Sequence, residues 1–246
     1  MRAELPAEPL RIAGPIYFVG TQRLASWLIA TPEGHMLLNT GVPGSGPMIE
    51  ASIRKLGFRP EDIRLLLIGH AHFDHAGGHA YMKRVSGAQV AAMAEEAPLL
   101  ESGGKTDFQY GAVPAFRFEP VKVDRLLRDG EIVTLGAVIL TARHTPGHTR
   151  GSTTWVTTAG RYKVVFPDGP GLNPGYRVGR DPSYAGIADD FRRTFRVLNE
   201  LKPDIWLAAH TDVFDFERKR RRGAWVDPGG YRRYVARHMR SFREQE

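Results

Sequence analysis

The stretch Leu65-Leu66-Leu67-Ile68-Gly69-His70-Ala71-His72-Phe73-Asp74-His75 decides how this chain is interpreted. Its first four residues form a short apolar run, which is typical of a strand buried on both faces of a sheet. Four potential metal ligands follow within six residues, three of them imidazoles. Imidazole and carboxylate groups suit Zn²⁺. Because a regular strand or helix cannot direct all four to one ion, we expect a turn that sends His70 and His72 to one metal and Asp74 and His75 to a neighbouring metal.

Further candidate ligands follow other predicted strands. His148 lies in a Pro/Gly turn, whereas Asp168 and His210 come soon after apolar runs. Ligand sites in α/β folds gather where strand ends meet loops, so we expect these side chains to approach the first cluster. The sequence therefore predicts a site for two metal ions. The strands predicted before these three residues are Val138–Ala142, Lys163–Phe166 and Ile205–Ala209.

The order of predicted elements indicates an α/β fold. Short strands open the chain and are followed by helices and buried strands, and the part after residue 130 repeats this order. Two sheets with helices outside are the simplest architecture for this pattern, and we expect one domain over residues 1–246. Within it, residues 1–12 are predicted to be an N-terminal extension and residues 217–246 basic C-terminal helices. Residues 102–125 are predicted to be a long loop, and such loops tend to be functional.

Composition excludes several classes of protein. The chain has 246 residues, of which 42% are hydrophobic, and no apolar run is long enough to span a membrane. It has no Cys, which excludes disulfides, a thiol nucleophile and thiolate zinc sites. The net charge is +7, and residues 217–246 hold ten Lys and Arg against four acids. We interpret this segment as the solvated face of terminal helices rather than a nucleic-acid site, because no nucleic-acid-binding motif accompanies it.

The ligand stretch and the following Ala76-Gly77-Gly78 resemble the signature of the metallo-β-lactamase superfamily, and His148 and His210 support the resemblance. The segments Gly103–Phe108 and Thr145–Trp155 narrow it to the third subclass of metallo-β-lactamases, whose second metal site uses Asp and His. The absence of Cys excludes the subclasses that place a thiolate there.

This resemblance implies an αββα sandwich with two Zn²⁺ ions in a groove at its rim. It implies that the loop 102–125 and the segment after Asp168 flank the groove. Asp168 itself is expected outside the ligand set. The ligands it implies are His70, His72 and His148 for the first zinc, and Asp74, His75 and His210 for the second.

The implied activity is zinc-dependent hydrolysis of the β-lactam amide in penicillins, cephalosporins and carbapenems, which would confer antibiotic resistance. In this hypothesis a zinc-bound hydroxide attacks the carbonyl. Asp74 serves as a ligand that orients the nucleophile, and Tyr176 is a candidate contact for the developing oxyanion. The alternative is a thioester or lactone hydrolase of the same superfamily, in which Asp168 bridges both metals.

One segment departs from the family pattern. Serines that help to hold the substrate commonly follow the residue equivalent to Asp168, whereas this chain has Gly169-Pro170-Gly171. The departure concerns substrate affinity and spectrum rather than the metal chemistry.

The expected partner is a small-molecule β-lactam, with no nucleic acid and no membrane, and the expected state is a monomer. The N-terminal residues contain no apolar segment of the kind that a secretory signal needs. We therefore expect a periplasmic protein if a leader peptide has been removed, and otherwise a cytoplasmic one.

Overall fold

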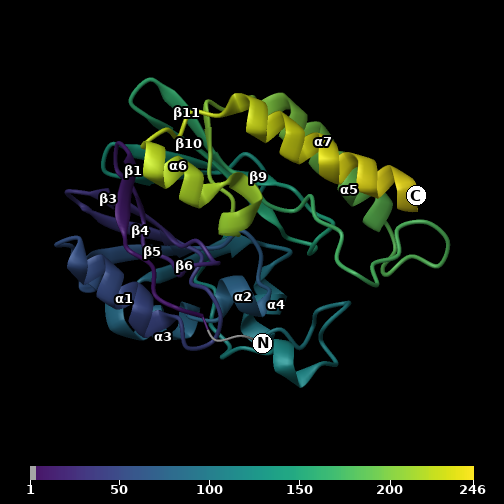
Figure 1. Ribbon diagram of the computed structural model, residues 1–246. Helices are drawn as coiled ribbons and strands as arrows, with labels where there is room; N and C mark the ends of the chain where they lie inside the picture. The colour runs from purple at the N-terminus through teal and green to yellow at the C-terminus, as the bar shows by residue number, and fades with distance from the viewer. Residues whose placement is uncertain (1–3) are drawn as a thin grey trace.

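Two β-sheets face each other and helices cover both outer sides in the computed structural model, which describes residues 4–246 (Figure 1). This arrangement confirms the predicted αββα sandwich. Residues 1–3 of the predicted N-terminal extension lie outside the described residues.

The first sheet contains seven strands in chain order. Strands β1 to β4 pair antiparallel, whereas β4 to β7 run parallel. Parallel pairing brings the carboxyl ends of β4, β5 and β6 to one edge of the sheet. The strands are β1 (Leu10–Ala13), β2 (Ile16–Phe18), β3 (Trp27–Thr31), β4 (Gly34–Leu38), β5 (Ile63–Leu67), β6 (Gln89–Met93) and β7 (Arg125–Leu127).

The second sheet has five strands in the order β12-β11-β10-β9-β8. Only the pair β11 and β12 is parallel among these described strands. The strands are β8 (Ile132–Leu135), β9 (Val138–His144), β10 (Thr153–Ala159), β11 (Tyr162–Phe166) and β12 (Ile205–Trp206).

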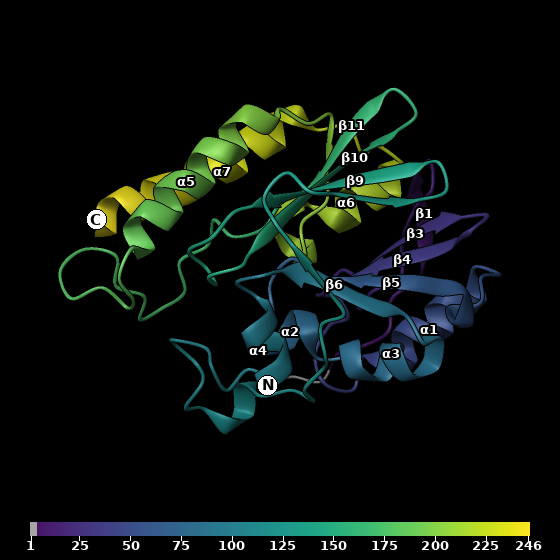
Figure 2. The same ribbon diagram turned by 180° about the vertical axis from the view of Figure 1, so that it is seen from behind.

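Helices α1 (Gly46–Lys55) and α3 (His79–Ser86) cover the first sheet, and α5 (Ile187–Leu201) and α7 (Pro228–Gln245) lie side by side over the second (Figure 2). Side chains alternate along each strand, so one face of the first sheet packs on α1 and α3 while the other meets the second sheet. The remaining helices are α2 (Phe73–Ala76), α4 (Ala97–Ser102), α6 (Phe216–Arg222) and the 3₁₀ turns η1 (Pro60–Asp62), η2 (Pro114–Phe116) and η3 (Thr211–Phe214).

The two sheets are joined by a hydrogen bond at the end of β5. Trp155, fully buried on β10, donates its indole Nε1–H to the carbonyl oxygen of Ile68 at 2.8 Å. Trp27, on β3, is buried in the same core, but its Nε1 has no partner among residues 4–246. The hydrogen bond of Trp155 therefore adds a directional link to apolar packing.

The structure differs from the sequence prediction in four elements. Strands β1 and β7 were not predicted, and β1 contains residues 10–12 of the expected extension. Strand β12 ends at Trp206, before the predicted end at Ala209. The sequence also predicts a helix near residues 75–85, but the structure divides this segment into α2 and α3 at Gly77 and Gly78. A Cβ at Gly77 would overlap the backbone of Val42 and Pro43, so the chain bends where this segment packs closely.

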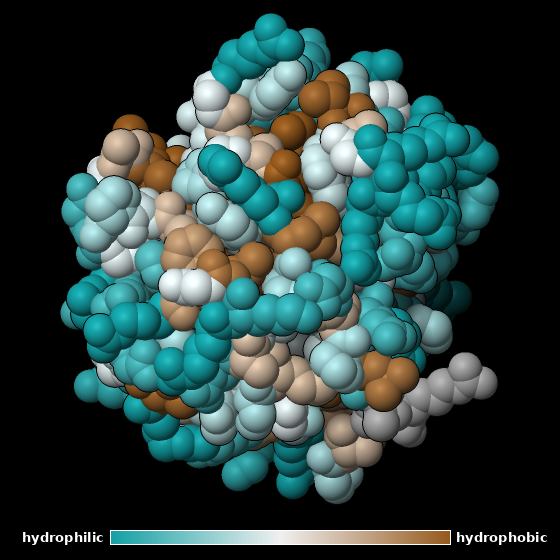
Figure 3. Space-filling view, turned by 60° about the vertical axis from the view of Figure 1, so that its left-hand side comes forward, coloured by the Kyte–Doolittle hydropathy of each residue, from teal (hydrophilic) through white to brown (hydrophobic). Residues whose placement is uncertain are grey.

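None of the helices within residues 4–246 is both long and apolar enough to cross a bilayer. On the face drawn in Figure 3, apolar residues gather toward the middle and hydrophilic residues surround them.

We expect Trp155→Phe to destabilise the protein more than Trp27→Phe, by about 1–3 kcal/mol, because only the first substitution leaves a buried carbonyl oxygen without its donor. Both replacements remove a similar volume from one core, so Trp27→Phe is the matched control. Urea unfolding of both variants measures the difference. Equal losses would show that the Trp155 hydrogen bond contributes nothing beyond packing.

Candidate metal centre

The ligand stretch begins at a point that is fixed from three sides. The carbonyl oxygen of Gly69 accepts a hydrogen bond from the Thr153 N–H at 2.7 Å. The Gly69 N–H donates to Asn39 Oδ1 at 2.9 Å. A Cβ at Gly69 would overlap the carboxyl group of Asp168, so this close approach requires glycine. His70 is therefore placed at the edge where the two sheets meet.

The chain turns directly after His70, as predicted. His72 precedes α2, and its carbonyl oxygen accepts from the N–H of His75 at 3.0 Å. This single helical turn places Asp74 and His75 in a second group that also lies beside His70. The six-residue stretch thus supplies side chains to two neighbouring clusters.

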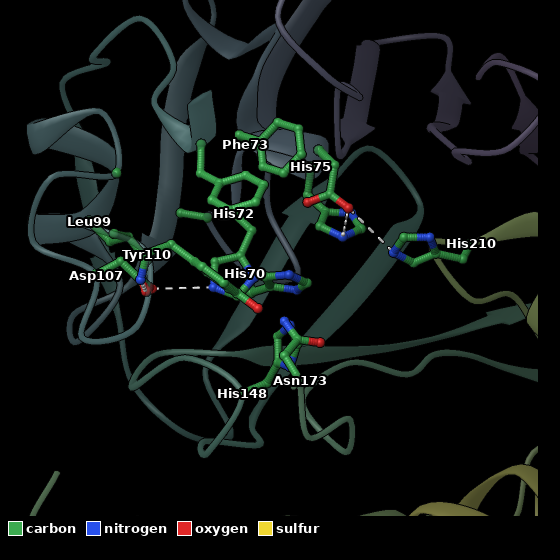
Figure 4. Close-up of a pocket in the computed structure, with 14 residues that line it drawn as sticks. His70, His72, Phe73, His75, Leu99, Asp107, Tyr110, His148, Asn173 and His210 are labelled. Atoms are coloured by element: carbon green, nitrogen blue, oxygen red, sulfur yellow. Dashed lines mark hydrogen bonds and ion pairs between the residues drawn. The ribbon is translucent and has the colours of Figure 1, made fainter. Parts of the chain in front are cut away.

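The first cluster contains His70, His72 and His148, whose ligand nitrogens all lie within 4.8 Å of one another (Figure 4). Each ring has one nitrogen engaged by an outer partner. Those contacts are His70 Nδ1 to Asp168 Oδ1 at 2.8 Å, His72 Nε2 to Asp107 Oδ2 at 3.2 Å, and His148 Nδ1 to the Gly171 carbonyl oxygen at 2.6 Å.

These outer contacts leave one nitrogen of each ring for a metal ion. The remaining atoms are His70 Nε2, His72 Nδ1 and His148 Nε2. His70 Nε2 is buried without a hydrogen-bond partner in the described part of the chain. A buried polar atom without a partner is costly, and three converging imidazole nitrogens are a donor set that suits zinc. The residues present therefore fit a metal ion.

The second cluster forms around Asp74. Its Oδ2 lies 3.5 Å from His75 Nε2 and 3.5 Å from His210 Nε2. His70, Asp74 and His75 also offer ligand atoms within 4.8 Å of one another. His210 reaches this position from the other sheet, where it follows β12 and pairs with Leu24 in an isolated β-bridge. All six residues predicted as ligands thus meet at one edge of the sandwich.

Burial favours the neutral form of three imidazoles in these clusters, those of His70, His75 and His148. Burial, together with the neighbouring imidazoles, lowers the pKa of His70 well below its ordinary value, and it lowers the pKa of His75 to about 4 and that of His148 to about 3. Burial alone would raise the pKa of Asp74, but His75 and His210 outweigh it, so the pKa is lowered and the carboxylate stays ionised. Neutral imidazole and ionised carboxylate are the forms that bind metals.

The two outer carboxyl groups differ in charge. Burial raises the pKa of Asp168 well above its usual range. Burial also acts to raise the pKa of Asp107, but hydrogen bonds from His72 and from the N–H groups of Gln109 and Tyr110 outweigh it, and the pKa is lowered. Because His70 is neutral and the pKa of Asp168 is raised, the contact between them is a hydrogen bond rather than an ion pair.

Glu96 was not among the predicted site residues, although it is fully buried beside the first cluster. Its carboxyl group accepts hydrogen bonds from the Ala71 N–H at 2.5 Å, the Thr149 hydroxyl at 2.7 Å and the Gly151 N–H at 2.9 Å. Glu96 therefore ties the loop of His70 and His72 to the loop of His148. Burial raises its pKa to about 7, although these donors oppose the shift. Asp107 was also missed, although it lies in the segment 103–108 that supported the resemblance.

Tyr176 does not line the cavity at the first cluster. It is buried, and its hydroxyl donates to the carbonyl oxygen of His148 at 2.6 Å.

In the segment after Asp168, Gly169 has φ +86°, and a Cβ there would overlap the carbonyl of Thr145. A Cβ at Gly171 would make ordinary van der Waals contact with the rings of His148 and His238, so a small side chain would fit at this position without a clash.

A cavity of about 180 Å³ lies against the ligand residues. The loop 102–125 lines it, as expected, through Asp107, Tyr110 and Phe116. Phe73 packs on Phe116 with ring centroids 5.0 Å apart, so apolar rings stand next to the polar cluster. Asn173 borders the same space (Figure 4).

Known proteins resemble this chain in sequence and in fold. The family model described as the metallo-beta-lactamase superfamily matches residues 23–210. The native FEZ-1 metallo-beta-lactamase from Legionella gormanii is 40% identical with a TM-score of 0.96, and the match covers 99% of this chain and 97% of that one. The class B3 di-zinc metallo-beta-lactamase LRA-12 from an Alaskan soil metagenome is 32% identical with a TM-score of 0.93, covering 98% and 95%.

Curated relatives match over shorter regions. An acyl-coenzyme A thioesterase of Gallus gallus is 33% identical over 166 residues, which cover 63% of this chain and 58% of the relative. The chain spans about half the length of the curated relatives it matches.

We expect Glu96→Gln to lower zinc affinity about 10- to 100-fold, because one amide oxygen cannot replace a carboxyl group that receives three donors. Its exposed neighbour provides the control variant, Glu95→Gln. Competition with a chromogenic chelator measures the affinity of both. Unchanged affinity in Glu96→Gln would show that the tie between the loops does not hold the site.

Acidification is expected to destabilise the metal-free protein. Burial lowers the pKa of His70, His75, His79, His148 and His238, so the unfolded chain binds protons below pH 6.5 that the folded chain does not. Glu96 and Asp168, whose pKa values are raised, oppose this effect but are fewer. Between pH 6.5 and 5 the free energy of unfolding should fall by about 3–5 kcal/mol. Urea titrations across this range measure it, and a constant or rising value would contradict the prediction.

Proposed function

The chain belongs to the metallo-β-lactamase superfamily, and from this membership we propose that it is a zinc-dependent β-lactamase that hydrolyses the amide bond of penicillins, cephalosporins and carbapenems. The observation that carries the proposal is the pair of adjoining His and Asp clusters at the edge of the sandwich. The solved structures that it resembles at 32–40% identity over nearly its whole length include subclass B3 enzymes.

We assign two zinc ions to these clusters. The first would be held by His70, His72 and His148, and the second by Asp74, His75 and His210. The similarity to LRA-12, a di-zinc enzyme, supports this number. Bound zinc supplies Lewis acidity, which polarises a carbonyl and activates water at neutral pH.

The chain's own residues set the orientation of the ligands. Asp107 and the Gly171 carbonyl accept from the outer nitrogens of His72 and His148, which fixes the tautomer whose inner nitrogen carries a lone pair. The ionised carboxylate of Asp74 faces His75 and His210, where it can serve as a ligand and orient the attacking group. Because these positions are set before substrate arrives, little reorganisation is needed during the reaction.

Tyr176 contacts the site through the backbone of His148. The Tyr176 hydroxyl donates a hydrogen bond to the carbonyl oxygen of His148. A direct contact with a developing oxyanion requires that hydroxyl to exchange its partner. The geometry therefore supports a positioning role for Tyr176 more directly than the oxyanion contact.

The alternative is a thioester or lactone hydrolase, and the thioesterase among the curated relatives favours the thioester activity. That alternative relies on Asp168 as a bridge between the metals. Asp168 instead contacts the outer nitrogen of His70, which favours the β-lactamase.

We further propose that expression in the periplasm of a susceptible bacterium confers resistance, and that the protein acts as a monomer on small molecules.

The proposal predicts that zinc-loaded protein opens the ring of a carbapenem and of benzylpenicillin, and that chelation abolishes turnover until zinc is returned. His148→Ala and His210→Ala should each lower kcat/KM about 10²–10³-fold, because a catalytic metal ion is worth several kcal/mol. His144→Ala is the control, since His144 bonds the Arg150 carbonyl oxygen rather than either cluster.

Absorbance assays with both β-lactams and with an acyl thioester distinguish the two functions. Thioester hydrolysis without β-lactam turnover by protein with two bound zinc ions would replace the proposed function with the alternative.

A further inference from the structure

A cavity of about 550 Å³ lies between α7 and the turn η3, outside the candidate metal centre. Figure 1 shows α7 on the outside of the molecule, over the second sheet. Among the described residues that line this cavity, none is a predicted metal ligand. Val213 and Tyr234 also line a smaller cavity that borders His148 and His210, so the two spaces adjoin. Small-molecule sites usually measure about 300–1,000 Å³, and the proposed function leaves this space without a role.

Three arginines of α7 form one wall of the cavity. Arg233, Arg237 and Arg240 are exposed and are spaced four and three residues apart, which places them on one face of the helix. At the rise of an α-helix the row is about 10 Å long. Their guanidinium groups form no ion pair within residues 4–246. Because neighbouring cations repel one another, an anion held between them would be stabilised.

The acidic residues of the lining do not cancel this charge. Asp227 forms an ion pair with Lys219 at 3.1 Å, and Asp215 forms one with Arg218 at 2.6 Å. Asp212 is the one acid of the lining without a basic partner in the described part of the chain. It offsets one of the three arginines, so two positive charges remain. A phosphate monoester carries about −1.5 to −2 at pH 7 and therefore matches this excess.

The floor of the cavity is built from buried groups. The ring of Trp206 is buried and packs on that of Tyr234 with centroids 5.0 Å apart. Lys219 is also buried, with its Nζ 4.8 Å from the centroid of Trp206, and its ion pair joins α6 to Asp227 at the start of α7. The shape of the floor is thus fixed before a ligand arrives, and the surrounding low-dielectric groups strengthen the attraction between charges.

We propose that this cavity binds a phosphate-bearing small molecule, whose phosphate oxygens are held by Arg233, Arg237 and Arg240. Each guanidinium presents a planar fork of donors that matches two phosphate oxygens. A carboxylate has only one charge and two oxygens, so it would leave part of the row without a partner. The inference does not depend on β-lactam hydrolysis, because the cavity contains no predicted ligand.

The same phosphate chemistry occurs in soluble esters and in lipid headgroups, and the lining favours the soluble source. Attachment to a bilayer requires large apolar side chains that insert into it. Ala236 is the one exposed apolar residue of the lining in the described structure, whereas Trp206 and Phe214 are buried. The cavity therefore offers cations around a hollow but no apolar anchor.

Calorimetric titration of the zinc-loaded full chain with glycerol 3-phosphate tests the proposal. Arg237→Gln removes the middle arginine of the row. Arg232→Gln is the matched control, because it makes the same change of charge at an exposed position of α7 that does not line the cavity. Arg233→Gln is a second variant of the row, and it keeps the test valid if Arg237→Gln fails to fold.

We expect Arg237→Gln and Arg233→Gln each to raise the Kd for glycerol 3-phosphate about tenfold, because each removes charge-assisted hydrogen bonds. Arg232→Gln should change the Kd by less than about twofold, since an exposed charge outside the cavity is screened by salt. Acetate should bind wild-type protein about tenfold more weakly than glycerol 3-phosphate, because it carries about half the charge.

Three results would overturn the site. The first is the absence of saturable binding at millimolar glycerol 3-phosphate, and the second is an equal rise of the Kd in Arg237→Gln and Arg232→Gln. The third is binding that disappears when zinc is removed but is unchanged in Arg237→Gln, which would place the phosphate at the metal centre.

Sedimentation with vesicles distinguishes the two sources of phosphate. We expect no more binding to phosphatidylglycerol vesicles than to phosphatidylcholine vesicles. Binding to phosphatidylglycerol that Arg237→Gln weakens, without binding of glycerol 3-phosphate, would overturn the soluble ligand in favour of a lipid headgroup.

Discussion

The attachment of the end of β5 to the second sheet is the constraint on which the site depends. Trp155 and Thr153, both on β10, hydrogen-bond the carbonyl oxygens of Ile68 and Gly69. These are the last two residues before His70. Dispersion and hydrophobic contacts have little directionality. If the two sheets met only through apolar side chains, one sheet could shift slightly relative to the other. Two backbone acceptors fixed by β10 remove that freedom where the ligands begin.

From this point outward, the site is organised by the outer nitrogens of its histidines. Three partners of different chemistry hold them: a buried carboxyl with a raised pKa at His70, an ionised carboxylate at His72 and a backbone carbonyl at His148. These three partners come from separate segments of the chain. The geometry of the first cluster therefore depends on how several loops pack against one another. Glu96 adds a further tie between two of these loops without any Lys or Arg within hydrogen-bonding distance in the described structure.

The residues that come together in the two clusters could be predicted because their signal is local. His70 to His75 form an unusually dense run, and His148 and His210 follow strands that apolar runs reveal. Glu96 could not be predicted, because its partners lie 25 and more residues away and one buried Glu has no local pattern. Strand β7 was missed because it has three residues, includes Arg125 and is exposed at Leu126, so its sequence lacks an apolar run. The close approach of Gly77 to the backbone of Val42 and Pro43, which leaves no room for a side chain, depends on tertiary packing and could not be predicted from the sequence.

The six predicted ligands are distributed unevenly along the chain, and this has a consequence for the order in which the protein is made. Four of them lie between residues 70 and 75, before the first sheet is complete, whereas the last is residue 210. During synthesis the strands of the first sheet can emerge and pair before His148 and His210 are made. At that stage residues 70–75 still lack these two histidines. Contacts between residues so distant in sequence form late, because the intervening chain must first be ordered. The candidate metal centre is therefore among the last parts of the fold to be completed, although most of its predicted ligands leave the ribosome early.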